Sequence, residues 1–217
     1  MKIRIKICCI SSVSEAQTAI ESGADAIGLV AKMPSGPGPI PDELIKKIAQ
    51  TVPPPIGTFL LTSETSASGI IKHHQRTNTN TIQIVDLLSD GSYSQIKNAL
   101  PSVKIVQVIH VIDSDSVDLA IKISENVDAI LLDSGNPNLK VKELGGTGRI
   151  HDWNLSRQIR ENSKCPVFLA GGLNPDNIKQ AIQEVRPFAV DVCSGVRTNG
   201  FLDKEKVSAF VNNTMII

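Results

Sequence analysis

Aromatic residues are scarce in this sequence, at 3% of 217 residues, and net charge is absent, because 22 basic residues balance 22 acidic ones. A chain without excess positive charge has no overall attraction to nucleic acid or to an anionic membrane. Nowhere do about 18 apolar residues follow one another, the length that a membrane-spanning helix needs. We therefore expect a cytoplasmic protein that has no nucleic-acid or membrane partner and recognises its ligand locally.

Cysteine is also rare, with only Cys8, Cys9, Cys165 and Cys193. Their spacing matches no zinc ribbon or zinc finger, and the N-terminus lacks the export signal that accompanies disulfide-rich secreted proteins. We predict four free thiols and no metal site.

Short β-branched runs alternate with segments of helical period along the whole chain, which is typical of repeated βα units around a parallel sheet. The expected strands are 3–10, 26–31, 56–62, 81–86, 104–111, 129–135, 166–172 and 189–195. This pattern favours a single (β/α)8 TIM barrel over residues 1–217, although a doubly wound open sheet uses the same units. A Pro/Gly cluster at 34–41 is expected in the loop after the second strand, at the end of the barrel where active sites lie.

The first strand carries polar side chains where a buried parallel strand is normally apolar. Alternation places Lys6 and Cys8 on one face, pointing into the barrel, with Cys8 nearer the C-terminal end of the strand. The same alternation turns Asp133 inward at the end of the sixth strand. Two groups capable of acid–base chemistry are therefore expected at the mouth of the barrel.

Two interpretations of Lys6 remain open from the sequence. A fixed positive charge about 7 Å from Cys8 would favour the thiolate by roughly 2 kcal/mol, which would bring the thiol pKa close to neutrality. Alternatively, Lys6 forms a buried ion pair with Asp191, an inward residue of the eighth strand, and much of that effect is cancelled.

Glycine runs follow the late strands, in "GGTG" (145–148), "AGGL" (170–173) and "CSGV" (193–196). Glycine lets backbone N–H groups approach an oxyanion closely, and loops after strands seven and eight of such barrels commonly hold phosphate. The candidate phosphate-binding residues are Gly146, Gly148, Gly171, Gly172, Ser194 and Gly195.

Several longer motifs carry a specific resemblance. They are "KICC" (6–9), "LLD" (131–133), "GGTGRIHDW" (145–153), "LAGGLNPDNI" (169–178) and "RPFAVDVCSGVR" (186–197). In this order the chain resembles the phosphoribosylanthranilate isomerase family, (β/α)8 enzymes of tryptophan biosynthesis. The resemblance implies an Amadori rearrangement of a phosphoribosylamine, with Cys8 as general base and Asp133 as general acid. It implies a small phosphoribosyl substrate, no metal and no other cofactor, and a monomer or homodimer. Lys6, Arg149 and Gln83 are candidates for further substrate contacts.

The chain departs from the family pattern in places. The segment 32–40 lacks the arginine that helps to bind the anthranilate end of the substrate in the family. Cys9 replaces the glycine after the catalytic cysteine, and Arg197 replaces a glutamate after the last motif. Two alternatives therefore remain, an isomerase of a different phosphoribosylated amine and a barrel that binds phosphate without catalysis.

Overall fold

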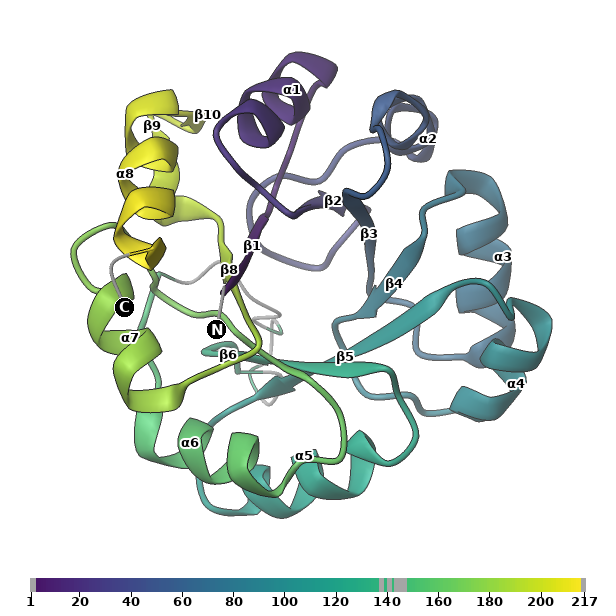
Figure 1. Cartoon of the computed structure of the whole chain (residues 1–217). Helices are drawn as coiled ribbons and strands as arrows, with labels where there is room; N and C mark the ends of the chain where they lie inside the picture. Colours follow the sequence, from purple (N-terminus) through teal and green to yellow (C-terminus); the bar gives the residue numbers. More distant parts are fainter. Residues whose placement is uncertain (1–2, 137–138, 140–141, 143–147, 216–217) are drawn as a thin grey trace.

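A closed barrel of eight parallel strands forms the centre of the molecule in a computed structural model that describes residues 3–136, 139, 142 and 148–215 (Figure 1). The strands are β1 (Arg4–Ile7), β2 (Ala26–Val30), β3 (Gly57–Thr62), β4 (Thr81–Ile84), β5 (Lys104–His110), β6 (Ala129–Asp133), β7 (Val167–Leu169) and β8 (Ala189–Val192). Each strand pairs with the next, and β1 pairs with both β2 and β8. The predicted (β/α)8 barrel is confirmed, and the open sheet is excluded.

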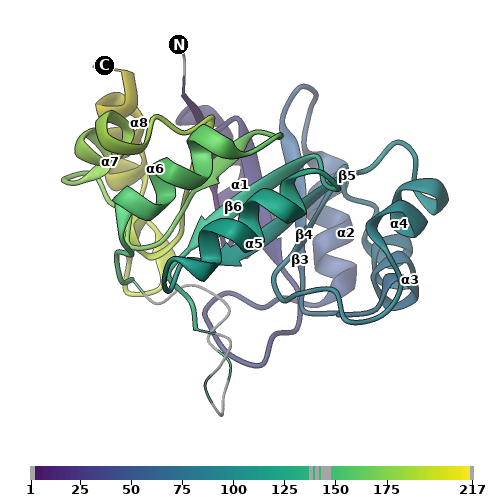
Figure 2. The same cartoon turned by 90° about the horizontal axis from the view of Figure 1, so that it is seen from below.

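Helices lie around the outside of the strands, and Figure 2 shows α5 and α6 across the outer face of the barrel. The helices are α1 (Val13–Glu21), α2 (Asp42–Thr51), α3 (Ala67–Thr77), α4 (Tyr93–Ala99), α5 (Asp115–Ser124), α6 (Trp153–Asn162), α7 (Ile178–Val185) and α8 (Lys204–Met215). A 3-10 turn, η1 (Ser194–Val196), and a small hairpin of β9 (Arg197–Thr198) and β10 (Phe201–Leu202) precede α8. In the described part of the chain, no helix combines the length and apolarity needed to cross a membrane.

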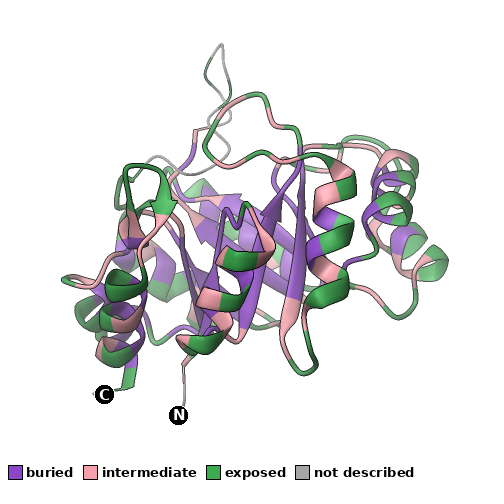
Figure 3. Ribbon diagram, turned by 90° about the horizontal axis from the view of Figure 1, so that it is seen from above, coloured by how far each residue is buried: buried purple, intermediate pink, exposed green. Residues whose placement is uncertain are grey.

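Alternation along the strands separates the core into two layers. Figure 3 shows the strands largely buried, while the surrounding helices carry exposed residues. Residues such as Ile5, Ile7 and Leu60 face the helices and join the large cluster between sheet and helices. Residues of the opposite parity fill the barrel itself, including Phe59 and Phe168, whose rings lie 5.9 Å apart between centroids. Because successive side chains on a strand point to opposite faces of the sheet, each strand contributes to both layers, as the sequence predicts.

Seven of the strands end earlier than the sequence predicts, whereas β3 ends at Thr62 as predicted; β1 shows one reason for an early end. It ends at Ile7, although the Cys8 amide still donates to the Val192 carbonyl at 2.8 Å. Cys9 then has φ +61°, a left-handed conformation that no strand residue adopts. Strand alternation alone predicts that Cys9 faces the helices, as Ile5 and Ile7 do. This prediction is wrong, because the turn places Cys9 in the inner cluster at the mouth of the barrel.

Candidate active site

A pocket opens at the C-terminal ends of the strands and contains most of the predicted site residues. Cys8 lines it from the end of β1 and Asp133 from the end of β6. Asp133 is fixed by the Ser134 amide, which donates to Oδ1 at 2.7 Å. The strands of the barrel bring Cys8 and Asp133 together although they are 125 positions apart in the chain. The pocket therefore holds both groups that the acid–base hypothesis requires.

Gly28 makes the space in which the Cys8 thiol lies. It occupies β2 beside Cys8, and a Cβ at this position would lie 2.8 Å from Cys8 Sγ and 3.0 Å from Lys6 Nζ. No other residue type fits there without displacing one of the two groups. Gly28 was not among the predicted site residues, although an isolated glycine inside a strand is a known sign of close approach by a neighbouring group.

Lys6 and Asp191 form a buried ion pair below the thiol, with Nζ 2.9 Å from Oδ2. Burial acts to lower the pKa of Lys6, but the negative charges of Asp191 and Cys8 outweigh it, so the pKa is raised and the ammonium is retained. The ring of Phe59 lies beneath the same ammonium, 5.2 Å from Nζ to the ring centroid. Of the two interpretations of Lys6, the structure supports the ion pair with Asp191.

The Cys8 thiol is not activated to neutrality in the free protein. Burial raises its pKa to about 11, against the lowering effect of the Lys6 charge. The idea that Lys6 brings the thiol pKa close to 7 is wrong for two reasons: Cys8 is removed from water, and Lys6 shares its charge with Asp191. What Lys6 does provide is a cation beside the sulfur that stabilises the thiolate whenever it forms.

The predicted phosphate residues gather on one side of the pocket. Gly148, Gly171, Gly172 and Ser194 line it. Gly171 and Gly172 have φ +81° and +64°, so both need glycine for conformation as well as for space. An anion can approach the N–H groups of such a loop without meeting a side chain. Gly146 lies outside the described residues.

Gly195 is required by the packing of the loops, and its predicted phosphate contact stays a prediction. It does not line the pocket, and a Cβ there would lie 2.1 Å from the Leu173 carbonyl oxygen. The glycine is needed because η1 packs directly on the loop after β7. Gly195 thus lets the loops after β7 and β8 pack against each other.

Gln83 and Arg149 were predicted to contact the substrate, but only Gln83 lines the pocket. Gln83 lines the wall from β4 and is buried. Arg149 is exposed and does not line the pocket; its backbone carbonyl packs on Gly172. Among the residues that the structure describes, no arginine or lysine lines this pocket.

In the same described part, no cluster of three or more His, Cys, Asp or Glu side chains is arranged to hold a metal ion.

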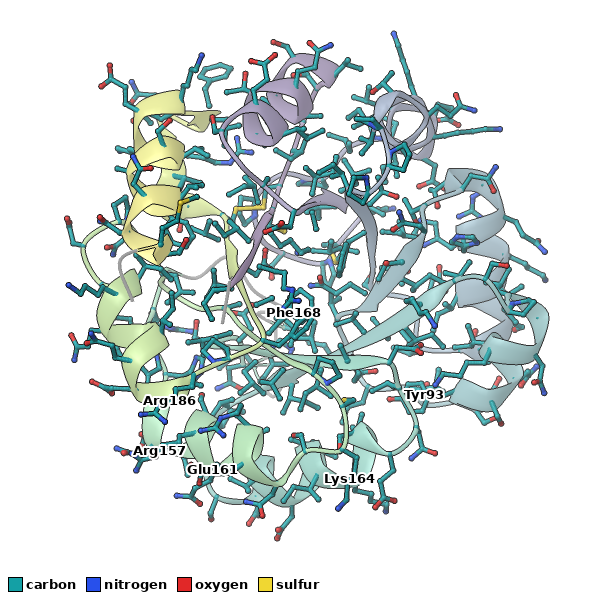
Figure 4. The ribbon with its side chains drawn as sticks, in the orientation of Figure 1. Tyr93, Arg157, Glu161, Lys164, Phe168 and Arg186 are labelled. Carbon is teal, nitrogen blue, oxygen red and sulfur yellow. A yellow bond between two sulfur atoms is a disulfide. The ribbon has the colours of Figure 1, made fainter. Side chains whose placement is uncertain are left out.

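Two of the four cysteines predicted to be free are joined to each other. Cys9 and Cys193 form a disulfide, with Cα atoms 5.9 Å apart, whereas Cys8 and Cys165 are free thiols. The bond appears in yellow beside β1 and β8 in Figure 4. Because β1 and β8 pair in parallel with Ile7 opposite Val192, the residues that follow each strand meet at the barrel mouth. The prediction failed because these two cysteines are 184 positions apart in sequence.

His151 is a second residue beside the pocket for which the sequence predicted no role. Its Nε2 lies 2.7 Å from Ser156 Oγ, and Nδ1 is buried with no hydrogen-bond partner. A Cβ on Gly171 would lie 3.0 Å from this Nδ1, so the ring lies directly behind the glycine loop. Burial lowers the pKa of His151 to about 4, although the carboxylates of Asp133 and Asp152 act to raise it.

Because His151 is neutral in the folded protein, we predict that the free energy of unfolding falls at acidic pH. A folded-state pKa below the unfolded value contributes stability above pH 6.5 that is lost as the pH falls toward 4. We expect His151 to account for a loss of about 2 kcal/mol in unfolding free energy between pH 7 and pH 4.5. Urea unfolding of the wild type and of His151→Gln at both pH values measures it. An equal pH-dependent loss in the two proteins would contradict the assignment, since only carboxylates common to both would then be titrating.

Comparison with known proteins gives one consistent result. Residues 5–213 match the family model described as N-(5'phosphoribosyl)anthranilate (PRA) isomerase. N-(5'-phosphoribosyl)anthranilate isomerase 2 of Methanosarcina mazei is 36% identical over 212 residues, covering 97% of this chain and 93% of that protein. The isomerase of Methanosarcina acetivorans is 33% identical over 224 residues, covering 97% and 92%.

Solved structures agree with the sequence matches. The crystal structure of phosphoribosyl anthranilate isomerase from Thermotoga maritima superposes with a TM-score of 0.81 at 28% identity, covering 99% of this chain and 100% of that one. A second isomerase structure, in complex with reduced 1-(o-carboxyphenylamino)-1-deoxyribulose 5-phosphate, has a TM-score of 0.78 at 26% identity, with the same coverage.

Proposed function

The chain belongs to the N-(5'-phosphoribosyl)anthranilate isomerase family, and on this basis we propose that Cys8 is its general base and Asp133 its general acid. It is an isomerase that catalyses an intramolecular rearrangement of N-(5'-phosphoribosyl)anthranilate. One observation carries the residue assignment: Cys8 and Asp133 line the same pocket as the glycine loop at Gly171 and Gly172.

The rearrangement needs a proton donor and a proton acceptor at different atoms of the sugar. Asp133 gives its proton to the ring oxygen, and the bond between that oxygen and C1′ breaks, leaving an iminium at C1′. Cys8 acts as the thiolate, which forms when the thiol releases its proton to solvent beside the Lys6 ammonium. The thiolate removes the proton from C2′, and the electron pair of that C–H bond forms the enolamine. Tautomerisation of the enolamine gives the C2′ ketone of the product.

The residues around Cys8 support its role as a base even though its pKa is high in the free protein. A thiol with a pKa of about 11 is a stronger base, once ionised, than one of ordinary pKa. The Lys6 ammonium lies beside it and favours the thiolate, while Asp191 fixes that ammonium at 2.9 Å. Gly28 leaves the sulfur room at the pocket wall.

Phosphate is proposed to bind at the loops after β7 and β8, through backbone N–H groups around Gly171 and Gly172 and the Ser194 hydroxyl. Gly148 lines the same side of the pocket. A phosphate held there keeps the sugar in register with Cys8 and Asp133, which converts binding energy into correct orientation of the reacting atoms.

The test is direct turnover. Purified protein is mixed with freshly made phosphoribosylanthranilate, and loss of anthranilate-type fluorescence is followed, with Cys8→Ala as control. We expect Cys8-dependent turnover with kcat/KM at or above about 10⁴ M⁻¹s⁻¹, the lower end of the usual enzyme range. A folded wild-type protein with no turnover above the Cys8→Ala control would contradict the proposal.

A second candidate substrate is another phosphoribosylated amine, and one observation favours it. None of the described residues lining the pocket is an arginine or lysine that could pair with the anthranilate carboxylate. Parallel assays with a phosphoribosylated amine that lacks a carboxylate distinguish the two. A higher kcat/KM for that compound than for phosphoribosylanthranilate would select the second candidate.

The assembly state is proposed as a monomer or a homodimer, and the location as the cytoplasm. One of the similar structures is described as mutually generated monomers of a dimeric phosphoribosylanthranilate isomerase. Light scattering of the purified protein decides between the two assembly states.

A further inference from the structure

We propose that Arg197, paired with Glu15, is a positioning residue for the general base: it holds the backbone carbonyls at Cys8 and Cys9 and thereby sets where the Cys8 thiol points. The proposal rests on the proposed role of Cys8 as base. Arg197 does not line the pocket, so its action on the reaction passes through the backbone that carries the sulfur.

The guanidinium of Arg197 reaches across from the segment after β8 to the end of β1. Its Nη2 donates to the Cys9 carbonyl oxygen and lies 3.5 Å from the Cys8 carbonyl oxygen. Its Nη1 donates to the Gly200 carbonyl oxygen at 2.9 Å. The side chain is 9% exposed, so water does not compete effectively for these donors. Arg197 therefore binds the two peptide units that follow the catalytic strand.

Glu15 fixes the guanidinium in that position. Its two oxygens accept from Nη1 at 3.0 Å and from Nη2 at 3.1 Å, the parallel geometry that makes arginine–carboxylate pairs directional. The amides of Ser11 and Leu202 donate to the same carboxylate, each at 2.9 Å. Burial acts to raise the pKa of Glu15, but these hydrogen bonds and the Arg197 charge keep the pKa below its usual value. The Glu15 carboxylate is thus charged and is fixed by Arg197 and by the two backbone amides.

The backbone at Cys9, which Arg197 holds, adopts an unfavourable conformation that requires support from its surroundings. Cys9 is a non-glycine residue at φ +61°, which persists only where the surroundings determine it. Two links fix this turn, the disulfide from Cys9 to Cys193 and the hydrogen bonds from Arg197. Both come from the segment after β8, which also carries Ser194 on the phosphate side of the pocket. The base and the phosphate loop are therefore joined through one set of contacts.

A rotation of the Cys8–Cys9 peptide would displace the sulfur relative to the sugar. A misplacement of about 1 Å at a reacting atom costs on the order of 100-fold in rate. The phosphate loop itself stays in place when Arg197 is shortened, because the disulfide and Gly195 packing still hold it. Loss of Arg197 should therefore lower kcat more than it raises KM.

The variants are Arg197→Met, which removes every donor, and Arg197→Lys, which keeps the charge and one direct hydrogen bond. Arg160→Met is the matched control, because Arg160 also donates to a backbone carbonyl, that of Val185, at 2.9 Å. This carbonyl ends α7 at the opposite end of the barrel, and the neighbouring Glu161 lies at the outer edge of the molecule in Figure 4.

We expect Arg197→Met to lower kcat by about 10- to 100-fold with KM changed less than threefold, and Arg197→Lys to recover part of the loss. Rates are expressed per folded protein, with the folded fraction taken from circular dichroism. A kcat within twofold of Arg160→Met would overturn the proposal and leave Arg197 a purely structural residue.

A measurement without substrate separates this proposal from the proposed function. In a Cys165→Ala background, kept free of reductant, Cys8 is the free thiol that iodoacetamide can alkylate. We expect Arg197→Met to raise the rate of Cys8 alkylation at least fivefold over Arg160→Met, because the backbone turn that carries the thiol is released. If wild-type protein turns over no phosphoribosylanthranilate, the alkylation result still decides the role of Arg197. An unchanged alkylation rate would overturn it whatever the activity.

Discussion

Replacement of Cys8 by alanine lowers kcat by at least about 10³-fold, because the reaction loses the group that accepts the C2′ proton and a positioned general base is worth on the order of 10²–10⁴ in rate. Two other ionisable groups lie near the sulfur. Lys6 keeps its proton, and Asp191, which also lines the pocket, is held by the Lys6 ammonium at 2.9 Å, so we expect neither to replace Cys8. Asp133→Asn has a similar effect, since an amide keeps the hydrogen bond from Ser134 but cannot supply a proton to the ring oxygen.

The measurement is kcat for both variants in the fluorescence assay, together with their thermal unfolding. Cys165→Ala and Asp128→Asn are the matched controls. Cys165 is the other free thiol, and Asp128 lies just before β6, at the opposite end of the strand from Asp133, where it accepts from the Ile105 amide at 2.9 Å. We expect both controls to retain wild-type kcat. Full activity in Cys8→Ala or in Asp133→Asn would remove that residue from the mechanism.

Breaking the Lys6–Asp191 pair destabilises the fold by about 3–5 kcal/mol, the usual cost of leaving one member of a buried ion pair without its partner. Lys6 is 1% exposed and Asp191 is 7% exposed, so neither variant side chain can turn into water. Lys6→Met leaves the buried Asp191 carboxylate without a partner, and Asp191→Asn leaves the buried Lys6 ammonium without its counter-charge. The same changes remove or weaken the cation beside the Cys8 sulfur, so activity falls together with stability.

Urea unfolding at pH 7 measures the loss for each single variant and for the double variant Lys6→Met/Asp191→Leu. We expect the double variant to recover most of the stability, because a buried ion pair replaced by apolar side chains of similar size is often as stable as the pair. It should not recover the activity. Glu161→Gln, which removes a partly exposed pair with Arg160 at 3.2 Å, is the control and should cost about 0–1 kcal/mol. Single variants within 1 kcal/mol of the wild type would contradict the buried pair.

The inward positions of Lys6, Cys8, Asp133 and Asp191 were predictable because they depend only on local alternation. A strand has a side-chain period of two, so a polar residue at the right parity must face the barrel whatever lies around it. The glycine motifs identified Gly148, Gly171 and Gly172 for the same kind of reason, since loops after late strands need little tertiary information to be placed.

The sequence by itself determined eight βα units, the parity of each strand and the identity of the family. Closure of the barrel, the Cys9–Cys193 bond and the Arg197–Glu15 pair were decided only by the tertiary structure. Each of these joins residues about 180 positions apart, where local periodicity carries no information about distance. The pKa of Cys8 was also decided only by the tertiary structure. It depends on how far the fold removes the thiol from water and on whether Lys6 is already paired with Asp191.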